Sequence, residues 1–225
     1  VDPQGSVATS FGYGRYDIKA GVLDIFTKDT PIEETIHPTG APNLDFIPSN
    51  VWSDEIEKRH LIGAAVESRL KTAIQVIRAK YDYIIIDCPP SMGNLTYNAL
   101  IAADSLIVPI QCEYYALKAL GRFLKMTRMI KREHNPLLRY RGFLMTMGDL
   151  RNNLSRRVIS KVRYTLQGLV FNTVIPRNIR LAEVPYYGKP VVAFDRTCKG
   201  ATSYLELAEE ILQQKQKDQT EAIAA

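Results

Sequence analysis

The 225-residue sequence has few of the features that define membrane, disulfide-rich or metal-binding proteins. No apolar run approaches the roughly 18 residues that a membrane-spanning helix needs. The three cysteines and three histidines are scattered without metal-ligand spacing. An odd number of cysteines argues against a disulfide framework and favours a reducing compartment, the cytoplasm. The hydrophobic content of 46% is ordinary for a globular protein with a substantial core.

A glycine-rich phosphate-binding loop is also missing from the sequence. The pattern G-x-x-x-x-G-K-[ST] does not occur, and Gly188-Lys189 is followed by Pro190. Such a loop supplies backbone N–H groups and a lysine for the phosphates, and a hydroxyl for Mg²⁺. A nucleotide site formed by these 225 residues alone would therefore lack the loop that makes the main contacts with the phosphates.

Positive charge is concentrated in one part of the chain. The net charge is +5, but the segment from Lys118 to Arg163 holds thirteen Lys and Arg and only two acids, Glu133 and Asp149. Unpaired like charges repel, and phosphates would neutralise them, so the segment predicts a surface for nucleic acid or another polyanion. Ordinary solvated basic faces are the alternative interpretation.

Strand and helix signals alternate along the chain, which predicts an α/β fold with a mostly parallel sheet flanked by helices. We expect one domain over residues 1–212 and a polar, frayed tail over 213–225. The expected strands are 43–48, the isoleucine run that ends at Asp87, 105–110, 142–147 and 169–175. The expected helices are 53–80, 94–103, 115–134, 153–166 and 201–214.

The stretch from Tyr81 to Pro90 is the most informative. Three consecutive isoleucines suit a parallel strand that is buried on both faces, and Pro89-Pro90 ends it. Asp87 would then lie at the carboxyl tip of this strand, where open α/β sheets bind ligands. In a nucleotide-hydrolysing protein a carboxylate there holds Mg²⁺ through its water shell. A core strand followed by an ordinary aspartate is the other interpretation.

Six blocks, taken in order, resemble the ParA/Soj-type partition ATPases, which are deviant-Walker P-loop proteins related to MinD. The blocks are Asp2-Pro3-Gln4-Gly5 with the small residues after it, 81–96, 108–117, 174–183, 187–190 and 199–201. Together they extend over residues 1 to about 212. The resemblance implies a P-loop NTPase-like fold that lacks here its first strand, its P-loop and its first helix. We therefore interpret the chain as an N-terminally truncated family member.

The resemblance also implies roles for individual residues. Asp2 would orient the attacking water in ATP hydrolysis, although at a chain terminus it would be inert if disordered. Asp87 would hold Mg²⁺ through water. Asn178 would meet the edge of the adenine, unless it is only a turn asparagine. The nucleotide-binding residues lie in two switch segments and in two loops around the adenine: Gly5, Ser6, Pro89, Met147, Pro176, Arg177 and Asn178.

DNA contact is expected from the basic residues of the C-terminal half. A further basic stripe on the helix 115–134 comprises Lys118, Arg122, Lys125 and Arg132, and Arg196 is a further candidate. Tyr140 and Tyr164 are expected to be core or edge residues rather than base-stacking platforms. The predicted DNA-binding residues are Arg156, Arg157, Lys161, Arg163, Arg180 and Lys199.

The resemblance predicts an ATPase that dimerises around two ATP molecules and binds DNA without sequence preference. A ParB-type partner would stimulate hydrolysis, and the protein would be cytoplasmic and associated with the nucleoid. A MinD-like membrane ATPase is a weaker alternative, because the polar face of the last helix is acidic (Glu206, Glu209, Glu210). A non-catalytic remnant that binds DNA or heterodimerises with an intact paralogue is a third.

Overall fold

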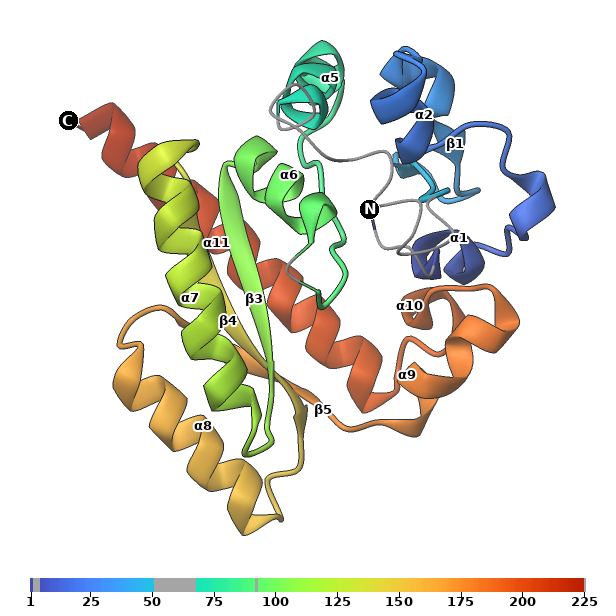
Figure 1. Cartoon of the computed structure of the whole chain (residues 1–225). Helices are drawn as coiled ribbons and strands as arrows, with labels where there is room; N and C mark the ends of the chain where they lie inside the picture. The colour runs from blue at the N-terminus through green and yellow to red at the C-terminus, as the bar shows by residue number, and fades with distance from the viewer. Residues whose placement is uncertain (2–4, 51–67, 92, 225) are drawn as a thin grey trace. The chain divides into compact units, whose positions relative to one another are not determined.

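The computed structural model describes residues 1, 5–50, 68–91 and 93–224. The chain divides into two compact units, which we describe separately (Figure 1). Of the helices in these ranges, none is both long enough and apolar enough to cross a membrane. The first unit comprises Val1–Asp104, Phe123–Arg139 and Pro185–Lys189, and the second comprises Ser105–Arg122, Tyr140–Val184 and Pro190–Ala225.

The first unit is built from short helices and one small antiparallel ribbon. In the ribbon, β1 (His37–Pro38) pairs with β2 (Asp45–Phe46), and His37 lies opposite Phe46. The helix α7 (Ala116–Glu133) contributes residues to both units. The remaining elements of the first unit are α1 (Ser6–Ser10), η1 (Arg15–Asp17), α2 (Val22–Thr27), η2 (Ile32–Thr35), α5 (Arg69–Ile77), η3 (Arg78–Lys80) and α6 (Asn94–Ala102).

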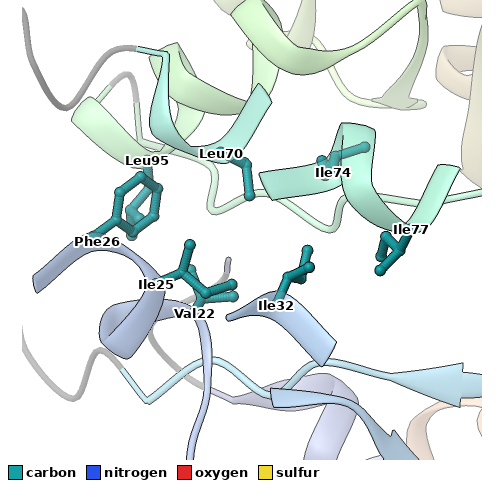
Figure 2. Packing of buried hydrophobic residues seen from close by; sticks show 8 residues of the cluster. All are labelled: Val22, Ile25, Phe26, Ile32, Leu70, Ile74, Ile77 and Leu95. Carbon is teal, nitrogen blue, oxygen red and sulfur yellow. The ribbon is translucent and has the colours of Figure 1, made fainter. Parts of the chain in front are cut away.

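The apolar core of the first unit lies between α2 and α5. On α5, Leu70, Ile74 and Ile77 follow helical spacing, so they form one buried face of the helix. Figure 2 shows this face opposite side chains of α2 and η2. The end of the predicted helix at Lys80 is confirmed, while its predicted beginning lies outside the described residues. The core comprises Val22, Ile25, Phe26, Ile32, Leu70, Ile74, Ile77 and Leu95.

A buried carboxylate organises the entrance to α2. Asp24 accepts hydrogen bonds from the backbone N–H of Gly21 (2.9 Å) and from Nδ2 of Asn50 (2.6 Å). It also pairs with Lys28 at 2.7 Å. Desolvation raises the pKa of Asp24, but the bonds from Lys28, Gly21 and Asn50 outweigh it, so the net pKa is lowered. Asp24 is therefore charged at neutral pH.

The isoleucine run does not form the predicted strand. Residues 81–87 form no helix, and they form no β-ladder with any residue that the structure describes. Ile84 is 37% exposed and Ile85 is 90% exposed, so the predicted burial on both faces is wrong. A strand requires a neighbour to bond its N–H and C=O groups and to cover its faces. Sequence pattern specifies the preference for a strand but does not supply that neighbour.

The second unit contains a three-stranded sheet in the order β3-β4-β5. β4 (Arg139–Gly148) and β5 (Val170–Pro176) are parallel. β3 (Ser105–Gln111) also runs parallel to β4. Backbone hydrogen bonds join Asp104 to Arg139 at the beginnings of the two strands and Cys112 to Thr146 near their ends. The other elements are α8 (Asn153–Thr165), α9 (Ile179–Glu183), α10 (Val191–Phe194) and α11 (Lys199–Ala224). The short helix η4 (Val184–Tyr187) has Val184 in this unit and its other three residues in the first.

Most predicted elements of this sheet and its helices are confirmed. β3 and β5 match the expected strands to within one residue at each end, and β4 is longer than the expected 142–147. α7 and α8 lie where apolar residues recur at helical spacing. In the first unit, α6 matches the expected helix 94–103 to within one residue. The 43–48 strand is present only as the two residues of β2.

A bulge interrupts the pairing of β5 with β4. Phe143 pairs with Val170 and Met145 with Val174, so four steps along β5 match two along β4. The extra residues include Asn172 and Thr173, whose backbone N–H groups donate to the carboxylate of Glu210 at 2.8 and 3.1 Å. Their side chains donate to the same carboxylate at 3.2 and 2.9 Å. The carboxylate of Glu210, on α11, therefore accepts hydrogen bonds from N–H groups that the bulge removes from the ladder.

The predicted frayed tail is instead part of a helix. α11 continues to Ala224, so the expectation that the helix stops near residue 214 is wrong. The segment after Leu212 is rich in Gln, Lys, Glu and Ala, which favour helix. Asp218 also pairs with Arg141 of β4 at 2.7 Å, which holds this part of the helix to the sheet. Leu207 packs with Leu144, Phe171 and Ile175 of the sheet.

Candidate functional site

One candidate site, in the first unit, surrounds Asp87. This residue is exposed, and its carbonyl oxygen accepts a hydrogen bond from the Val1 nitrogen at 2.9 Å. The chain near position 1 is therefore adjacent to the backbone of Asp87. The second acid of the predicted pair, Asp2, lies outside the described residues.

The segment after Asp87 is anchored to α6. Pro89 is buried, and the hydroxyl of Thr96, itself 5% exposed, donates to the carbonyl oxygen of Ser91 at 2.7 Å. Gly5 is buried with a φ of 66° and precedes α1, whose first residue, Ser6, is exposed. The two predicted switch segments thus both include short, structured stretches.

Cys88 follows Asp87 directly but is not an activated thiol. Desolvation is the main cause that raises the pKa of Cys88 to about 11; the Asp87 charge adds to it and the Val1 ammonium opposes it. The thiol is therefore protonated at neutral pH, although the residue as a whole is exposed.

A separate candidate site, in the second unit, is the carboxyl edge of the β3-β4-β5 sheet. The backbone N–H of Arg177, after β5, donates to the carbonyl of Gly148, at the end of β4, at 3.2 Å. The Arg177 guanidinium reaches Glu113, after β3, at 3.4 Å. These contacts join the loops that follow all three strands. Three of the four predicted base-binding residues, Pro176, Arg177 and Asn178, follow one another at the end of β5 and in the loop after it.

At this edge Met147 has an unusual backbone conformation, and the side chain of Asn178 caps a helix. Met147 has a φ of 55° and is 44% exposed. A left-handed conformation is uncommon for a residue other than glycine, and such residues cluster at functional sites. Oδ1 of Asn178 caps α9 by accepting from the N–H of Arg180 at 2.9 Å. The side-chain NH₂ of Asn178 is then the group best suited to donate to a ligand.

The helix α8 presents a basic outer face. Val158, Ile159 and Val162 are buried, and Asn152 caps the helix by accepting from the N–H of Leu154 at 2.8 Å. Arg157 and Lys161 are exposed and separated by four residues, so they lie on one face. Neither forms an ion pair with a carboxylate that the structure describes.

Comparisons with known proteins identify the family. A family model described as an AAA domain matches residues 1–140. The sporulation initiation inhibitor protein Soj of Bacillus subtilis is 42% identical over 211 residues, which cover 94% of this chain and 83% of that protein. The chromosome partitioning protein ParA of Myxococcus xanthus is 40% identical over 212 residues, which cover 94% of this chain and 75% of that protein. The chain belongs to the ParA/Soj family of partitioning proteins.

A solved structure agrees with this assignment. Cobyrinic acid a,c-diamide synthase from Mycobacterium smegmatis, with a bound ATP analogue and magnesium, matches with a TM-score of 0.79. It is 31% identical, and the match covers 96% of this chain and 80% of that one. The predicted ParA/Soj membership and the P-loop NTPase-like α/β fold are therefore confirmed.

The other predicted DNA-binding residues of this ParA/Soj family member differ in the hydrogen bonds and ion pairs that their side chains already form. Arg163 donates to the carbonyl of Asn172 at 3.0 Å, and Arg156 bonds the Asn153 side chain. Arg180 pairs with Glu183 at 3.0 Å and with Asp195 at 3.7 Å. Lys199 is exposed at the start of α11. Arg157 and Lys161 are thus better candidates for phosphate contact than Arg180.

Two features of the ParA/Soj chain were not found from the sequence. Tyr164 was expected to be a core or edge residue, but it is 73% exposed, with the Lys161 ammonium 5.9 Å from its ring centroid. Tyr140 does stack on Phe143, with 5.3 Å between ring centroids. Glu113 was not recognised as a site residue, although a charged residue directly after a buried strand was a usable signal.

Proposed function

We propose that the protein is a ParA-like ATPase that acts in chromosome or plasmid partitioning. In this proposal ATP binding drives dimerisation, the dimer binds DNA without sequence preference, and a ParB-type partner stimulates hydrolysis. The observation that carries the proposal is the exposed basic face of α8 in a chain of the ParA/Soj family, where Arg157 and Lys161 form no ion pair with the carboxylates that the structure describes.

The chain offers groups suited to nucleotide and magnesium. Asp87 provides an exposed, hard carboxylate oxygen, the type of donor that Mg²⁺ prefers. Bound magnesium would neutralise phosphate charge. Asp2 would accept a hydrogen bond from the attacking water, while Gly5, Ser6 and Pro89 would place backbone groups at the phosphates. The solved relative with an ATP analogue and magnesium supports this choice of ligand.

The base would be held at the carboxyl edge of the sheet. Met147 offers a polarizable thioether, which packs well on aromatic rings. Pro176 ends β5 and Arg177 follows it, and the Asn178 NH₂ can donate to a ring nitrogen while its Oδ1 caps α9. These residues would orient adenine and exclude water from its face.

The basic helices would supply the DNA contacts. Arg157 and Lys161 can each neutralise a phosphate, and Arg156, Arg163 and Lys199 would extend the surface. On α7, Lys118, Arg122, Lys125 and Arg132 are exposed along the helix. Contacts of this kind carry no sequence information, in agreement with non-specific binding.

A salt titration of DNA binding tests the proposal. We expect Arg157→Ala/Lys161→Ala to weaken binding to a 30-base-pair duplex by about tenfold at low salt and to reduce the slope of log K against log salt by about two. The double variant Lys19→Ala/Lys80→Ala removes the same charge at exposed residues outside the basic segment and should leave both quantities unchanged. Equal effects of the two variants would contradict a specific role for α8.

Nucleotide dependence separates the switch from the non-catalytic alternative. If the protein is an ATP-driven switch, Mg-ATP should strengthen DNA binding and ADP should not. DNA affinity that is the same with and without Mg-ATP would instead identify a binding module without a nucleotide switch. Asp87→Asn should abolish the effect of Mg-ATP while leaving nucleotide-free DNA binding unchanged, because the substitution removes none of the basic residues proposed to contact phosphates.

A further inference from the structure

A close backbone contact joins two glycines from opposite ends of the first unit's sequence. Gly12 follows α1 and has a φ of 79°, while Gly188 lies in the loop Pro185–Lys189 and has a φ of 58°. A Cβ atom added to Gly188 would lie 2.9 Å from Cα and 3.1 Å from N of Gly12. Both neighbouring atoms are backbone atoms, so no side chain can move aside to relieve the overlap.

The two glycines differ in how closely an added Cβ atom would approach the other residue, so their substitutions can be compared. A Cβ atom added to Gly12 would meet only the carbonyl oxygen of Gly188, at an ordinary 3.7 Å. Substitution of Gly12 therefore strains its positive φ without creating an overlap. Substitution of Gly188 does both.

Other contacts make the end of α1 a defined structure. The N–H of Gly12 donates to Thr9, and the N–H of Tyr13 donates to Ala8, each at 3.0 Å. The ring of Tyr13 lies 5.0 Å from that of Phe46, and its hydroxyl donates to a backbone carbonyl of the ribbon at 2.8 Å. Because α1 and the chain after it are ordered in this way, a displacement of α1 moves Gly12 with it.

The loop that Gly188 belongs to carries two exposed aromatic side chains. Tyr186 is 89% exposed and Tyr187 is 52% exposed, with ring centroids 5.3 Å apart in an edge-to-face arrangement. The N–H of Gly188 donates to the carbonyl of Pro185 at 3.3 Å, which closes the loop behind the tyrosines. The position of Gly188 therefore controls the position of the tyrosine pair.

We propose that Gly188 is a positioning residue that couples α1 to the tyrosine loop, Pro185–Lys189. When α1 shifts, the backbone contact transmits the shift to Tyr186 and Tyr187, and these exposed side chains change position. Exposed tyrosines are common anchors of protein–protein interfaces, so this loop is suited to report the state of α1 to a partner protein. The coupling rests on the proposed function, in which the residues from Gly5 to Gly12 respond to nucleotide.

Hydrogen exchange of the full chain without nucleotide tests the contact. We expect Gly188→Ala to raise amide exchange in residues 6–13 by about tenfold or more, while α5 and α6 keep their exchange rates. Gly12→Ala should have a smaller effect. Gly40→Ala, which has a φ of 77° and no atom within 4 Å of its added Cβ, controls for backbone strain alone. Similar exchange in the Gly188 and Gly40 variants would overturn the proposal, as would a general rise across α5 and α6.

Exchange with Mg-ATP then tests the coupling. In the unsubstituted protein Mg-ATP should slow exchange in residues 6–13 and in 185–189 together. In Gly188→Ala it should slow exchange only in 6–13. Protection of 6–13 without protection of the loop in the unsubstituted protein would overturn the coupling. Protection of neither segment, after a positive result without nucleotide, would refute the nucleotide function and uphold the contact between α1 and the loop.

Discussion

The two edge strands of the three-stranded sheet differ in what bonds their outward groups. On β5, the bulge at Asn172 is covered by both neighbouring helices: Glu210 of α11 accepts its N–H and Arg163 of α8 donates to its carbonyl oxygen. On β3, no strand among the described residues pairs with the outer edge, and Ile107 is 43% exposed. One edge is thus closed by charged side chains and the other is open.

This difference shows where the sheet gains its stability. Phe171 of β5 is 1% exposed and packs with Leu207 of α11. On β3, Val108 and Ile110 are buried on one face, while the alternate residues are exposed. Charged groups that bond an edge strand also prevent it from pairing with another chain. We therefore expect substitutions at the β5 edge to change folding and those at the β3 edge to change association.

The largest effect is expected from the core beneath the closed edge. Phe171→Ala should lower the free energy of unfolding by about 3–5 kcal/mol, because it removes a fully buried ring and leaves a cavity. The matched variant Ile107→Ala, on the open edge, should cost less than about 1 kcal/mol. Urea denaturation followed by circular dichroism measures both, and equal losses would contradict the comparison.

Removal of the carboxylate that closes the bulge comes next. Glu210→Ala should lower the free energy of unfolding by about 2–3 kcal/mol, because the N–H groups of Asn172 and Thr173 lose their acceptor. Glu210→Gln retains one oxygen and should lose about half as much. Glu209→Ala, an exposed neighbour on the same helix, serves as the control. Hydrogen exchange of the two amides would show whether they become exposed together.

A carboxylate in the first unit can be compared with Glu210, because it also accepts a hydrogen bond from a backbone N–H group. Asp24 also accepts a backbone N–H, and its pKa is lowered below the ordinary 3.8. Its contribution to stability should therefore be complete above about pH 4 and be lost as the pH falls through its lowered pKa. Asp24→Asn should cost about 1–2 kcal/mol at pH 7 and flatten the stability profile below pH 4. An unchanged profile would show that Asp24 does not stabilise the fold through its charge.

The smallest effect on stability is expected at the open edge itself. Ile107→Lys should change the free energy of unfolding by less than about 0.5 kcal/mol, because the side chain is already partly in water. It should reduce self-association at high protein concentration, since a charge opposes edge-to-edge pairing. Sedimentation velocity measures that association. A loss of stability comparable with that of Glu210→Ala would indicate that the β3 edge is covered.

Much of the fold could be predicted from the sequence because local pattern determines it. α8 begins at its Asn152 cap and buries Val158, Ile159 and Val162 at helical spacing. The ParA/Soj relationship also followed from short motifs in order, and the comparisons confirm it. These features depend on residues that are close together along the chain.

Several of the errors concern contacts between distant residues. Ile85 has the composition of a buried strand but is 90% exposed, because nothing in the described chain pairs with it. Tyr164 falls within an amphipathic helix, and its 73% exposure depends on which side of that helix packs. The bond between Glu210 and Asn172 joins residues that no local pattern relates.

The sequence by itself determined the family, the basic segment and the order of the helices and strands that were confirmed, because periodicity, capping and motifs act over a few residues. Only the tertiary structure decided which strand edge is closed, that Gly188 lies against Gly12, and which basic side chains form ion pairs with the carboxylates that the structure describes. These properties depend on distances between residues far apart in the chain, and the free energy of each contact exists only after the backbone has brought its partners together.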